Sequence, residues 1–286
     1  MTPARRIFRS YLYVPASDPR RVEKALASEA DAVVLDLEDA VAPNRKAEAR
    51  ENVAEALRSR LDKPVFVRVN ALGSPLFVQD LGAVAGPDLF GIRLPKTENP
   101  EQVRRVAEAL EASGSEAGIQ CLIESALGLE LAFEISRSHE RVTNVSLGEA
   151  DLSADLGVRG EAGLLYARSR VVAASRAARL AGPVQSVYTD VRDLDGLRRS
   201  TREGRDLGIV GRSAIHPSQI PIINEVFTPS EAEVAGAEDL LNRLAESAER
   251  GTGAFVLENG RFVDKAVVEQ ARVTLALADQ IAEEAS

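Results

Sequence analysis

Eight short apolar runs alternate with helix-forming segments over residues 10–215 of this 286-residue chain. Most of these runs are almost continuously apolar, which is typical of parallel strands buried on both faces. In chain order the runs are Ser10–Val14, Ala32–Asp36, Val65–Val69, Leu89–Leu94, Gly118–Ile123, Val142–Leu147, Pro183–Tyr188 and Gly211–Ile215. The alternation therefore predicts an α/β fold built on a parallel sheet.

Helix signals lie between the runs. Asp18 and Pro19 offer a capping side chain and a proline at the first helical position. A segment beginning at Pro100 carries the i, i+3, i+4, i+7 spacing of a buried helical face at Val103, Val106, Ala107 and Leu110. Eight strands, each followed by a helix, predict a (β/α)8 TIM barrel. The alternative is a doubly wound open sheet, but no glycine-rich dinucleotide-binding loop follows the first run.

The pattern changes after residue 228. Pro229–Arg250 has the character of one helix, and Lys265–Glu284 of another. Between them, Ala254–Val263 predicts a hairpin, because Asn-Gly is the preferred two-residue turn. We therefore expect a barrel over residues 1–228 and a short C-terminal helix–hairpin–helix extension over residues 229–286.

The composition excludes several classes of function. Lys and Arg number 35 against 44 Asp and Glu, for a net charge of −9, which argues against sequence-independent binding of nucleic acid. A single cysteine, Cys121, excludes an internal disulfide framework, and two histidines disfavour a multi-histidine metal site. Neither a signal-peptide core nor an apolar stretch of membrane-spanning length is present, so we expect a cytoplasmic protein.

The active site of such a barrel lies at the carboxyl ends of its strands. Glu124 follows the fifth run and Asp151 the neighbouring sixth, so their carboxylates can converge. Two carboxylates without a thiolate or imidazole suit Mg²⁺, which completes its shell with water and substrate oxygens. The alternative is that one of them caps a helix and the other pairs with an arginine.

Arg68 stands inside the apolar third run, where a guanidinium is costly unless it meets an anion. Its planar fork suits a substrate carboxylate, or else it forms a structural ion pair with Asp36 or Glu38. Asp36, Glu38 and Asp39 place three carboxylates in four residues, and they need a nearby cation to be ionised together. They predict a general base or a water network around a metal, with helix capping as the simpler interpretation.

Two further strand-end residues are weaker candidates. Lys96 follows the fourth run and could bind a phosphate or thioester oxygen, form a Schiff base, or merely reach solvent. His216 follows the eighth run, and before Pro217 such a histidine more often fixes a loop by hydrogen bonding. Tyr13, Phe66 and Cys121 are expected in the core.

Seven short motifs in order carry a family resemblance. They resemble the citrate lyase beta subunit-like proteins of the HpcH/HpaI aldolase family, which include malyl-CoA and citramalyl-CoA lyases. The resemblance covers essentially the whole chain. The motifs are Arg9–Pro15, Val34–Val41, Val67–Asn70, Leu94–Lys96, Ile123–Ser125, Leu147–Asp151 and Ala214–Pro217.

The resemblance implies a Mg²⁺-dependent barrel that is usually trimeric or hexameric. Glu124 and Asp151 correspond to the metal ligands, Arg68 to the residue that grips the carboxylate of a 2-oxo acid, and Glu124 also contacts that substrate. Asp36 and Glu38 correspond to the acidic pair near the metal waters, with Asp39 and Lys96 around them. Asp264 corresponds to an acid/base that reaches a neighbouring subunit's site.

This family pattern implies reversible carbon–carbon cleavage of a 3-hydroxyacyl-CoA, such as citramalyl-, malyl- or citryl-CoA, to a 2-oxo acid and an acyl-CoA. Asp36, or the metal-bound water it holds, would accept the hydroxyl proton. Family members often have a lysine at the position of Arg212, before the Ile-His-Pro motif. Whether Arg212 contacts a substrate phosphate as that lysine would therefore stays open. Three alternatives also stay open: a metal-dependent aldolase acting on 2-oxo acids without CoA, a citrate lyase subunit acting on a carrier-bound thioester, and a binding protein without catalysis.

Overall fold

The computed structural model describes residues 6–59, 63–249, 255–256, 262–263 and 265–284. The chain divides into two compact units, Met1–Glu225 and Val226–Ser286. No helix within the described residues combines the length and apolar character needed to cross a membrane.

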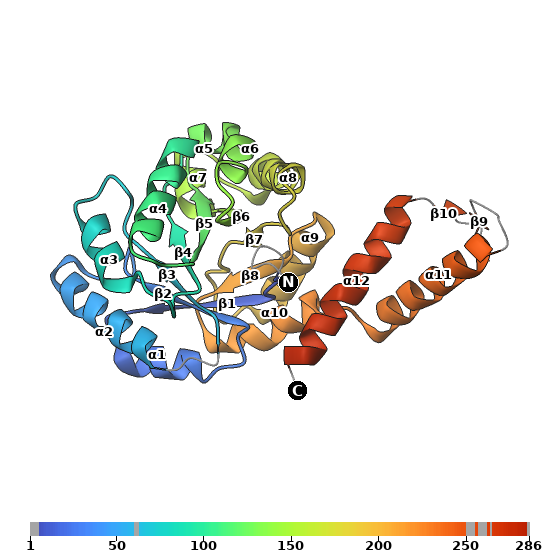
Figure 1. Cartoon of the computed structure of the whole chain (residues 1–286), viewed down its shortest axis with the longest axis horizontal. Coiled ribbons are helices and arrows are strands. Elements are labelled where there is room, and N and C mark those ends of the chain that lie inside the picture. The colour runs from blue at the N-terminus through green and yellow to red at the C-terminus, as the bar shows by residue number, and fades with distance from the viewer. Residues whose placement is uncertain (1–5, 60–62, 250–254, 257–261, 264, 285–286) are drawn as a thin grey trace. The chain divides into compact units, whose positions relative to one another are not determined.

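The first unit is the predicted (β/α)8 barrel (Figure 1). Its eight strands follow the order β6-β5-β4-β3-β2-β1-β8-β7, and every neighbouring pair is parallel. The strands are β1 (Ser10–Pro15), β2 (Ala32–Asp36), β3 (Val65–Arg68), β4 (Gly91–Leu94), β5 (Gly118–Ile123), β6 (Val142–Leu147), β7 (Val184–Gln185) and β8 (Gly211–Ala214).

Side chains complete the barrel between β6 and β7. The Ser146 hydroxyl accepts a hydrogen bond from the Val184 backbone N–H at 2.9 Å. Asn144 donates its Nδ2 to the carbonyl oxygen of Gly182 at 2.6 Å. These bonds satisfy backbone groups that the two-residue strand β7 leaves without a ladder partner, so the barrel closes at its shortest strand.

Helices follow the strands and surround the barrel (Figure 1). The predicted cap at Asp18 is present, because its side chain accepts a hydrogen bond from the Arg21 N–H, and Asn99 and Gln102 form a capping box. The helical elements are α1 (Pro19–Leu26), η2 (Pro43–Arg45), α2 (Lys46–Arg58), α3 (Leu76–Val84), α4 (Pro100–Ala112), α5 (Ala126–Glu130), α6 (Ala132–Ser136), α7 (Glu149–Leu156), α8 (Glu161–Ala177), α9 (Leu194–Asp206), η3 (Pro217–Gln219) and α10 (Ile220–Phe227).

Two helical segments have features that the strand–helix alternation alone does not specify. The residues between β5 and β6 form two short helices, α5 and α6, which meet at Leu131. Helix α9 follows the seventh strand as the alternation predicts, and the residues it buries are mostly small or polar, namely Gly196, Leu197, Thr201 and Gly204.

An aromatic cluster fills the amino-terminal end of the barrel. The rings of Phe8, Tyr11, Phe66 and Phe90 pack mostly edge to face, with the Phe66 and Phe90 centroids 5.2 Å apart. Phe66 is 1% exposed, so its truncation to alanine would cost about 3–5 kcal/mol. These rings leave only a small pocket at this end, and the much larger pocket of the barrel opens at the opposite end.

The second unit contains α11 (Glu231–Glu249), the antiparallel pair β9 (Phe255–Val256) and β10 (Phe262–Val263), and α12 (Lys265–Glu284). Helices α11 and α12 pack through a small apolar cluster of Ala237, Leu240, Val268 and Ala271. This order is the predicted helix–hairpin–helix, while the Asn259-Gly260 turn lies outside the described residues.

Candidate active site

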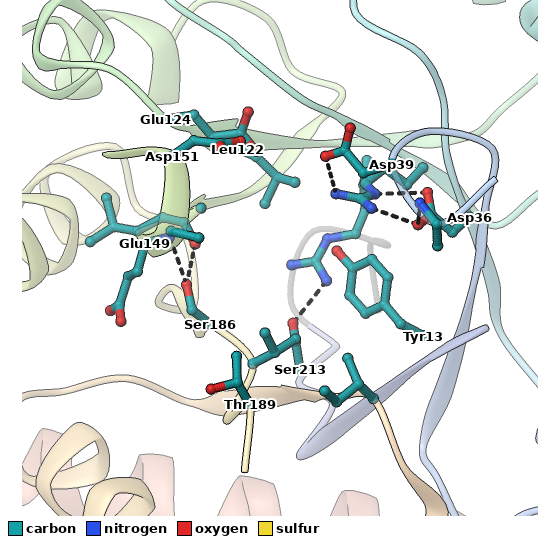
Figure 2. Close-up of a pocket in the computed structure, with 18 of the residues that line it drawn as sticks. Tyr13, Asp36, Asp39, Leu122, Glu124, Glu149, Asp151, Ser186, Thr189 and Ser213 are labelled. Atoms are coloured by element: carbon teal, nitrogen blue, oxygen red, sulfur yellow. Dashed lines mark hydrogen bonds and ion pairs between the residues drawn. The ribbon is translucent and has the colours of Figure 1, made fainter. Parts of the chain in front are cut away.

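A pocket opens at the carboxyl ends of the strands, where the sequence placed the site. Figure 2 shows Glu124 and Asp151 on one side of the pocket and Asp36 and Asp39 on the opposite side, with Tyr13 beside the central space. The strand-end residues therefore converge, although they come from segments that are far apart in the sequence.

Glu124 and Asp151 form the acidic side of the pocket. Glu124 directly follows β5 and is 7% exposed, whereas Asp151 lies exposed in the first turn of α7. Burial, together with the charges of Glu38 and Asp151, raises the pKa of Glu124 to about 7. A cation placed between a buried carboxylate and its acidic neighbours stabilises the charged form of that carboxylate.

Gly148 makes room for the Glu124 side chain. A Cβ at this position would lie 2.5 Å from Cγ and 2.6 Å from Oε1 of Glu124, closer than real Cβ contacts. Gly148 has φ −93° and ψ 85°, so this glycine is required for space rather than for a left-handed backbone. The sequence motif Leu147–Asp151 thus contains the candidate metal ligand Asp151 and also Gly148, which leaves space for the other candidate ligand, Glu124.

Lys96 connects the acidic side to the opposite one. Its backbone has φ +51°, a left-handed conformation that is uncommon for lysine, and its N–H donates to Glu124 Oε2 at 3.1 Å. Its Nζ pairs with Glu38 Oε1 at 3.3 Å. Burial lowers the Lys96 pKa, but the charge and hydrogen bond of Glu38, with the charges of Asp39 and Glu124, together outweigh this effect and the net shift is upward. Lys96 is therefore engaged with two carboxylates of the pocket.

Arg68 is held in the orientation expected of an anion-binding residue. Its Nε and Nη2 donate to the two oxygens of Asp36 at 2.8 and 2.5 Å. Its Nη1 lies 3.0 Å from Glu38 Oε2, and the Asp39 carboxylate is 3.7 Å away. Burial lowers the pKa of Arg68, but the hydrogen bond to Asp36 and the charges of Asp36, Tyr13 and Glu38 together outweigh it and raise the pKa. The structural ion pair proposed as an alternative from the sequence is thus present.

Asp36 has every acceptor position occupied. Besides both nitrogens of Arg68, it accepts the backbone N–H groups of Glu38 at 2.8 Å and Ala40 at 3.2 Å. Asp36 is 1% exposed. A carboxylate with four donors has its charge well compensated, so this environment favours positioning of Arg68 over acceptance of a proton.

Lys46 is a positioning residue that the sequence analysis missed. Its Nζ donates to the carbonyl oxygens of Leu37 and Glu38 at 2.6 Å each and to Asn70 Oδ1 at 3.0 Å. These bonds fix the loop after β2 against the end of β3, and with it the Glu38 carboxylate. No sequence signal identified Lys46, because its partners come from a different loop.

Arg93 is a second residue that the sequence analysis missed. It lies in β4, is 1% exposed and lines the same pocket as Arg68. The reasoning that singled out Arg68, a charge inside an apolar run, applies equally to Arg93 in Leu89–Leu94 and could have found it.

Comparison with known proteins decides the family. Residues 9–217 match the HpcH/HpaI aldolase/citrate lyase family. The chain belongs to this family. The barrel accounts for the whole match, and the second unit lies beyond it.

Relatives within the family are named for different activities. An L-malyl-CoA/beta-methylmalyl-CoA lyase of Cereibacter sphaeroides is 37% identical over 311 residues, covering 98% of this chain and 97% of that protein. A (3S)-malyl-CoA thioesterase of the same species is 36% identical, with 96% of each chain covered. The crystal structure of CitE from Mycobacterium tuberculosis, in complex with magnesium, acetoacetate and coenzyme A, has a TM-score of 0.77 and 32% identity. It covers 94% of this chain and 97% of its own.

The donor set of this family member fits a divalent cation. Within the described residues no three His, Cys, Asp or Glu side chains form a cage for a metal. Glu124 and Asp151 nevertheless face the same pocket, and burial, with the charges of Glu38 and Asp151, raises the pKa of Glu124, a state that a bound cation would relieve. Two carboxylates suffice for Mg²⁺, since it usually retains several waters.

The remaining strand-end residues have structural partners. Glu149 pairs with Arg168 through two bonds of 2.7 Å. His216 Nδ1 bonds with Ser218 and fixes the loop after β8, as its simpler interpretation predicted. Arg212 donates to Ser200 and Thr201 on α9 and is absent from the pocket lining, so a phosphate contact there has no support. Asp264 lies outside the described residues.

Proposed function

We propose that this chain is a Mg²⁺-dependent carbon–carbon lyase that cleaves, or forms, a 3-hydroxyacyl-CoA thioester. The observation that carries the proposal is the pairing of Glu124 and Asp151 across one pocket from Arg68, in a barrel of the HpcH/HpaI family. The relatives named malyl-CoA lyase and the CitE structure with magnesium and coenzyme A support the same chemistry.

Glu124 and Asp151 would hold the ion, and Arg68 would bind the carboxylate that becomes part of the 2-oxo acid. Mg²⁺ bound there would polarise the substrate hydroxyl and lower its pKa. Asp36 fixes two nitrogens of Arg68 and so aims the guanidinium before substrate arrives. Such preorganisation lowers the reorganisation needed during the reaction.

Cleavage breaks the bond between the hydroxyl-bearing carbon and the α-carbon of the thioester. The hydroxyl proton passes to a carboxylate, and Asp36 would have to release Arg68 in order to accept it. The electron pair moves to the α-carbon as a thioester enolate, which takes a proton from Asp264 of a neighbouring subunit. The products are a 2-oxo acid and an acyl-CoA, and condensation follows the same steps in reverse.

The test is cleavage of malyl-, citramalyl- and citryl-CoA by the purified protein, with and without EDTA. We expect activity on at least one of them, lost in EDTA and restored by Mg²⁺. Calorimetry on Glu124→Ala should show no Mg²⁺ binding. Full activity in EDTA would refute the metal role, and unchanged Mg²⁺ affinity would refute the ligand assignment.

A thioesterase activity is the second candidate, favoured by the relative named (3S)-malyl-CoA thioesterase. The same assay separates the two, because hydrolysis releases free CoA thiol whereas cleavage leaves the thioester intact. Substrates without CoA test the aldolase alternative. Activity on free CoA esters would exclude a strict requirement for a carrier-bound thioester.

We also propose that the enzyme is a cytoplasmic homotrimer or homohexamer in which residues 229–286 contact a neighbouring subunit. The buried free thiol of Cys121 fits a reducing compartment. Light scattering of the purified chain measures the assembly, and a monomer with full activity would contradict the role given to Asp264.

A further inference from the structure

Arg93 is a buried cation that no carboxylate neutralises within the described part of the chain. Its Nη1 donates to the Ser213 hydroxyl at 3.1 Å, across the barrel from β4 to β8, and its Nε is buried without a partner. No described acidic side chain forms an ion pair with it. A guanidinium in this state is costly unless an anion reaches it, and unpaired buried charges are rare for that reason.

The side chains around Arg93 hold its guanidinium group beside the pocket. Its Cζ lies 5.1 Å from the ring centroid of Tyr11 and 5.3 Å from that of Tyr13, and the Cζ of Arg68 lies 5.4 Å from the same Tyr13 ring. Arg68 and Arg93 are direct partners in the β3–β4 ladder. Two guanidinium groups thus share one tyrosine at the pocket, where Figure 2 shows Tyr13 and Ser213 bordering the central space.

The two guanidinium groups differ in their charge balance. Arg68 is surrounded by Asp36, Glu38 and Asp39, whereas Arg93 has only a hydroxyl and two aromatic faces. An arginine fork is suited to a carboxylate, which it can bind through two parallel hydrogen bonds. In the pocket, Arg68 would bind the carboxylate that all 2-oxo acids share. A 2-oxo acid with no other carboxylate would leave Arg93 without an anion.

We propose that Arg93 is a specificity-determining residue that binds a second carboxylate, so that the pocket prefers a 2-oxo dicarboxylate to a 2-oxo monocarboxylate. This inference rests on the proposed function and narrows its substrate class. A site built around a polar partner rejects analogues that lack it, because its own buried group is then left unpaired.

The test compares citryl-CoA, whose cleavage gives oxaloacetate, with citramalyl-CoA, which gives pyruvate. In the wild-type protein we expect a higher kcat/KM for citryl-CoA. Arg93→Met should lower kcat/KM for citryl-CoA by about 10- to 100-fold, the loss of a charged hydrogen-bonded contact, and leave citramalyl-CoA nearly unchanged. Arg93→Lys retains the charge and should recover part of the preference.

Arg212→Met is the matched control. Arg212 is also buried, has an unpaired Nε, donates to two hydroxyl groups and packs on a tyrosine, but does not line the pocket. Its loss should reduce the melting temperature without changing the ratio between the two substrates. If Arg93→Met lowers activity on both substrates equally, Arg93 is only structural and the proposal is overturned.

A binding measurement separates this inference from the proposed function. Calorimetric titration of the Mg²⁺-loaded protein with oxaloacetate and with pyruvate needs no turnover. If oxaloacetate binds more tightly than pyruvate and this difference disappears in Arg93→Met, the inference is supported. A failure to cleave any thioester would overturn the lyase proposal but not this inference. Equal affinity for the two acids in the wild-type protein overturns the inference, whatever the activity. Should Arg93→Met not fold, Arg93→Lys serves as the test: a weaker preference for oxaloacetate than in the wild-type protein supports the inference, and an unchanged preference overturns it.

Discussion

Gly148→Ala should impair the site while leaving the fold intact. The added Cβ would lie 2.5 Å from Glu124 Cγ, and ordinary contact begins near 3.4 Å, so the glutamate must retreat by about 1 Å. The atoms in the way belong to a side chain with rotatable bonds, which can swing aside. The backbone of Gly148, at φ −93°, imposes no left-handed strain on alanine.

The expected magnitudes follow from that displacement. A misplacement of about 1 Å at a reacting centre costs on the order of 100-fold in rate, so kcat/KM should fall by about that factor. Mg²⁺ affinity should fall with it, because Glu124 is a proposed ligand. The free energy of unfolding should change by less than about 1 kcal/mol, since alanine also restricts the unfolded chain.

Gly82→Ala is the control for this substitution. Gly82 lies inside α3, and a Cβ added there would have nothing within 4 Å, so the same chemical change meets open space. It should leave Mg²⁺ affinity and turnover unchanged and stabilise the helix by up to about 1 kcal/mol. Calorimetry with Mg²⁺, steady-state kinetics and thermal unfolding measure the three quantities. A Gly148→Ala protein with wild-type metal affinity and turnover would show that the Glu124 carboxylate is not needed where the structure places it.

Three other substitutions test the site. Asp36→Asn leaves half-buried Arg68 without its main partner, although Glu38 and Asp39 remain beside it, and should cost about 1–3 kcal/mol in unfolding free energy; a KM rise larger than the kcat loss indicates positioning, and the opposite split indicates a base. Lys46→Met removes two hydrogen bonds to the loop that carries Glu38 and a third to Asn70, and urea unfolding should show a loss of about 2–4 kcal/mol, with no loss contradicting its structural role. Asp264→Asn should reduce turnover by about 10²- to 10⁴-fold without changing Mg²⁺ affinity, and normal turnover would exclude it as the acid/base.

The barrel could be predicted because its strands are buried on both faces. Ala32–Asp36 is wholly buried, so nearly every residue of the run had to be apolar and the run was visible in the sequence. Helix α9 was expected only from the strand–helix alternation and not from an apolar period of its own, because it packs small and polar residues such as Gly204 against the barrel and exposes charged ones. Periodicity reports only the faces that bury large apolar side chains.

The sequence predicted where in the fold the site lies, but not which residues contact one another there. The rule that catalytic groups follow barrel strands led to Glu124, Asp151 and Arg68, and the structure places all three on the lining of one pocket. It could not find Lys46, which belongs to a helix and reaches the site only because its Nζ meets two carbonyl oxygens of another loop. Hydrogen bonds between backbone and a distant side chain leave no pattern in a single sequence.

Arg68 shows why the two interpretations of a buried arginine do not exclude one another. The sequence offered an ion pair or a substrate contact, and the structure has the ion pair. Asp36 occupies Nε and Nη2, while Glu38 approaches Nη1 and also pairs with Lys96. Under the proposed function, an incoming carboxylate would displace Glu38 Oε2 from Nη1, while Lys96 keeps its ion pair with Glu38 Oε1. The buried Oε2 would then lose its cation, so the displacement has a cost that the substrate contact must outweigh. The ion pairs with Asp36 would keep the guanidinium aimed and charged before substrate binds, so an ion pair at such a position is compatible with anion binding.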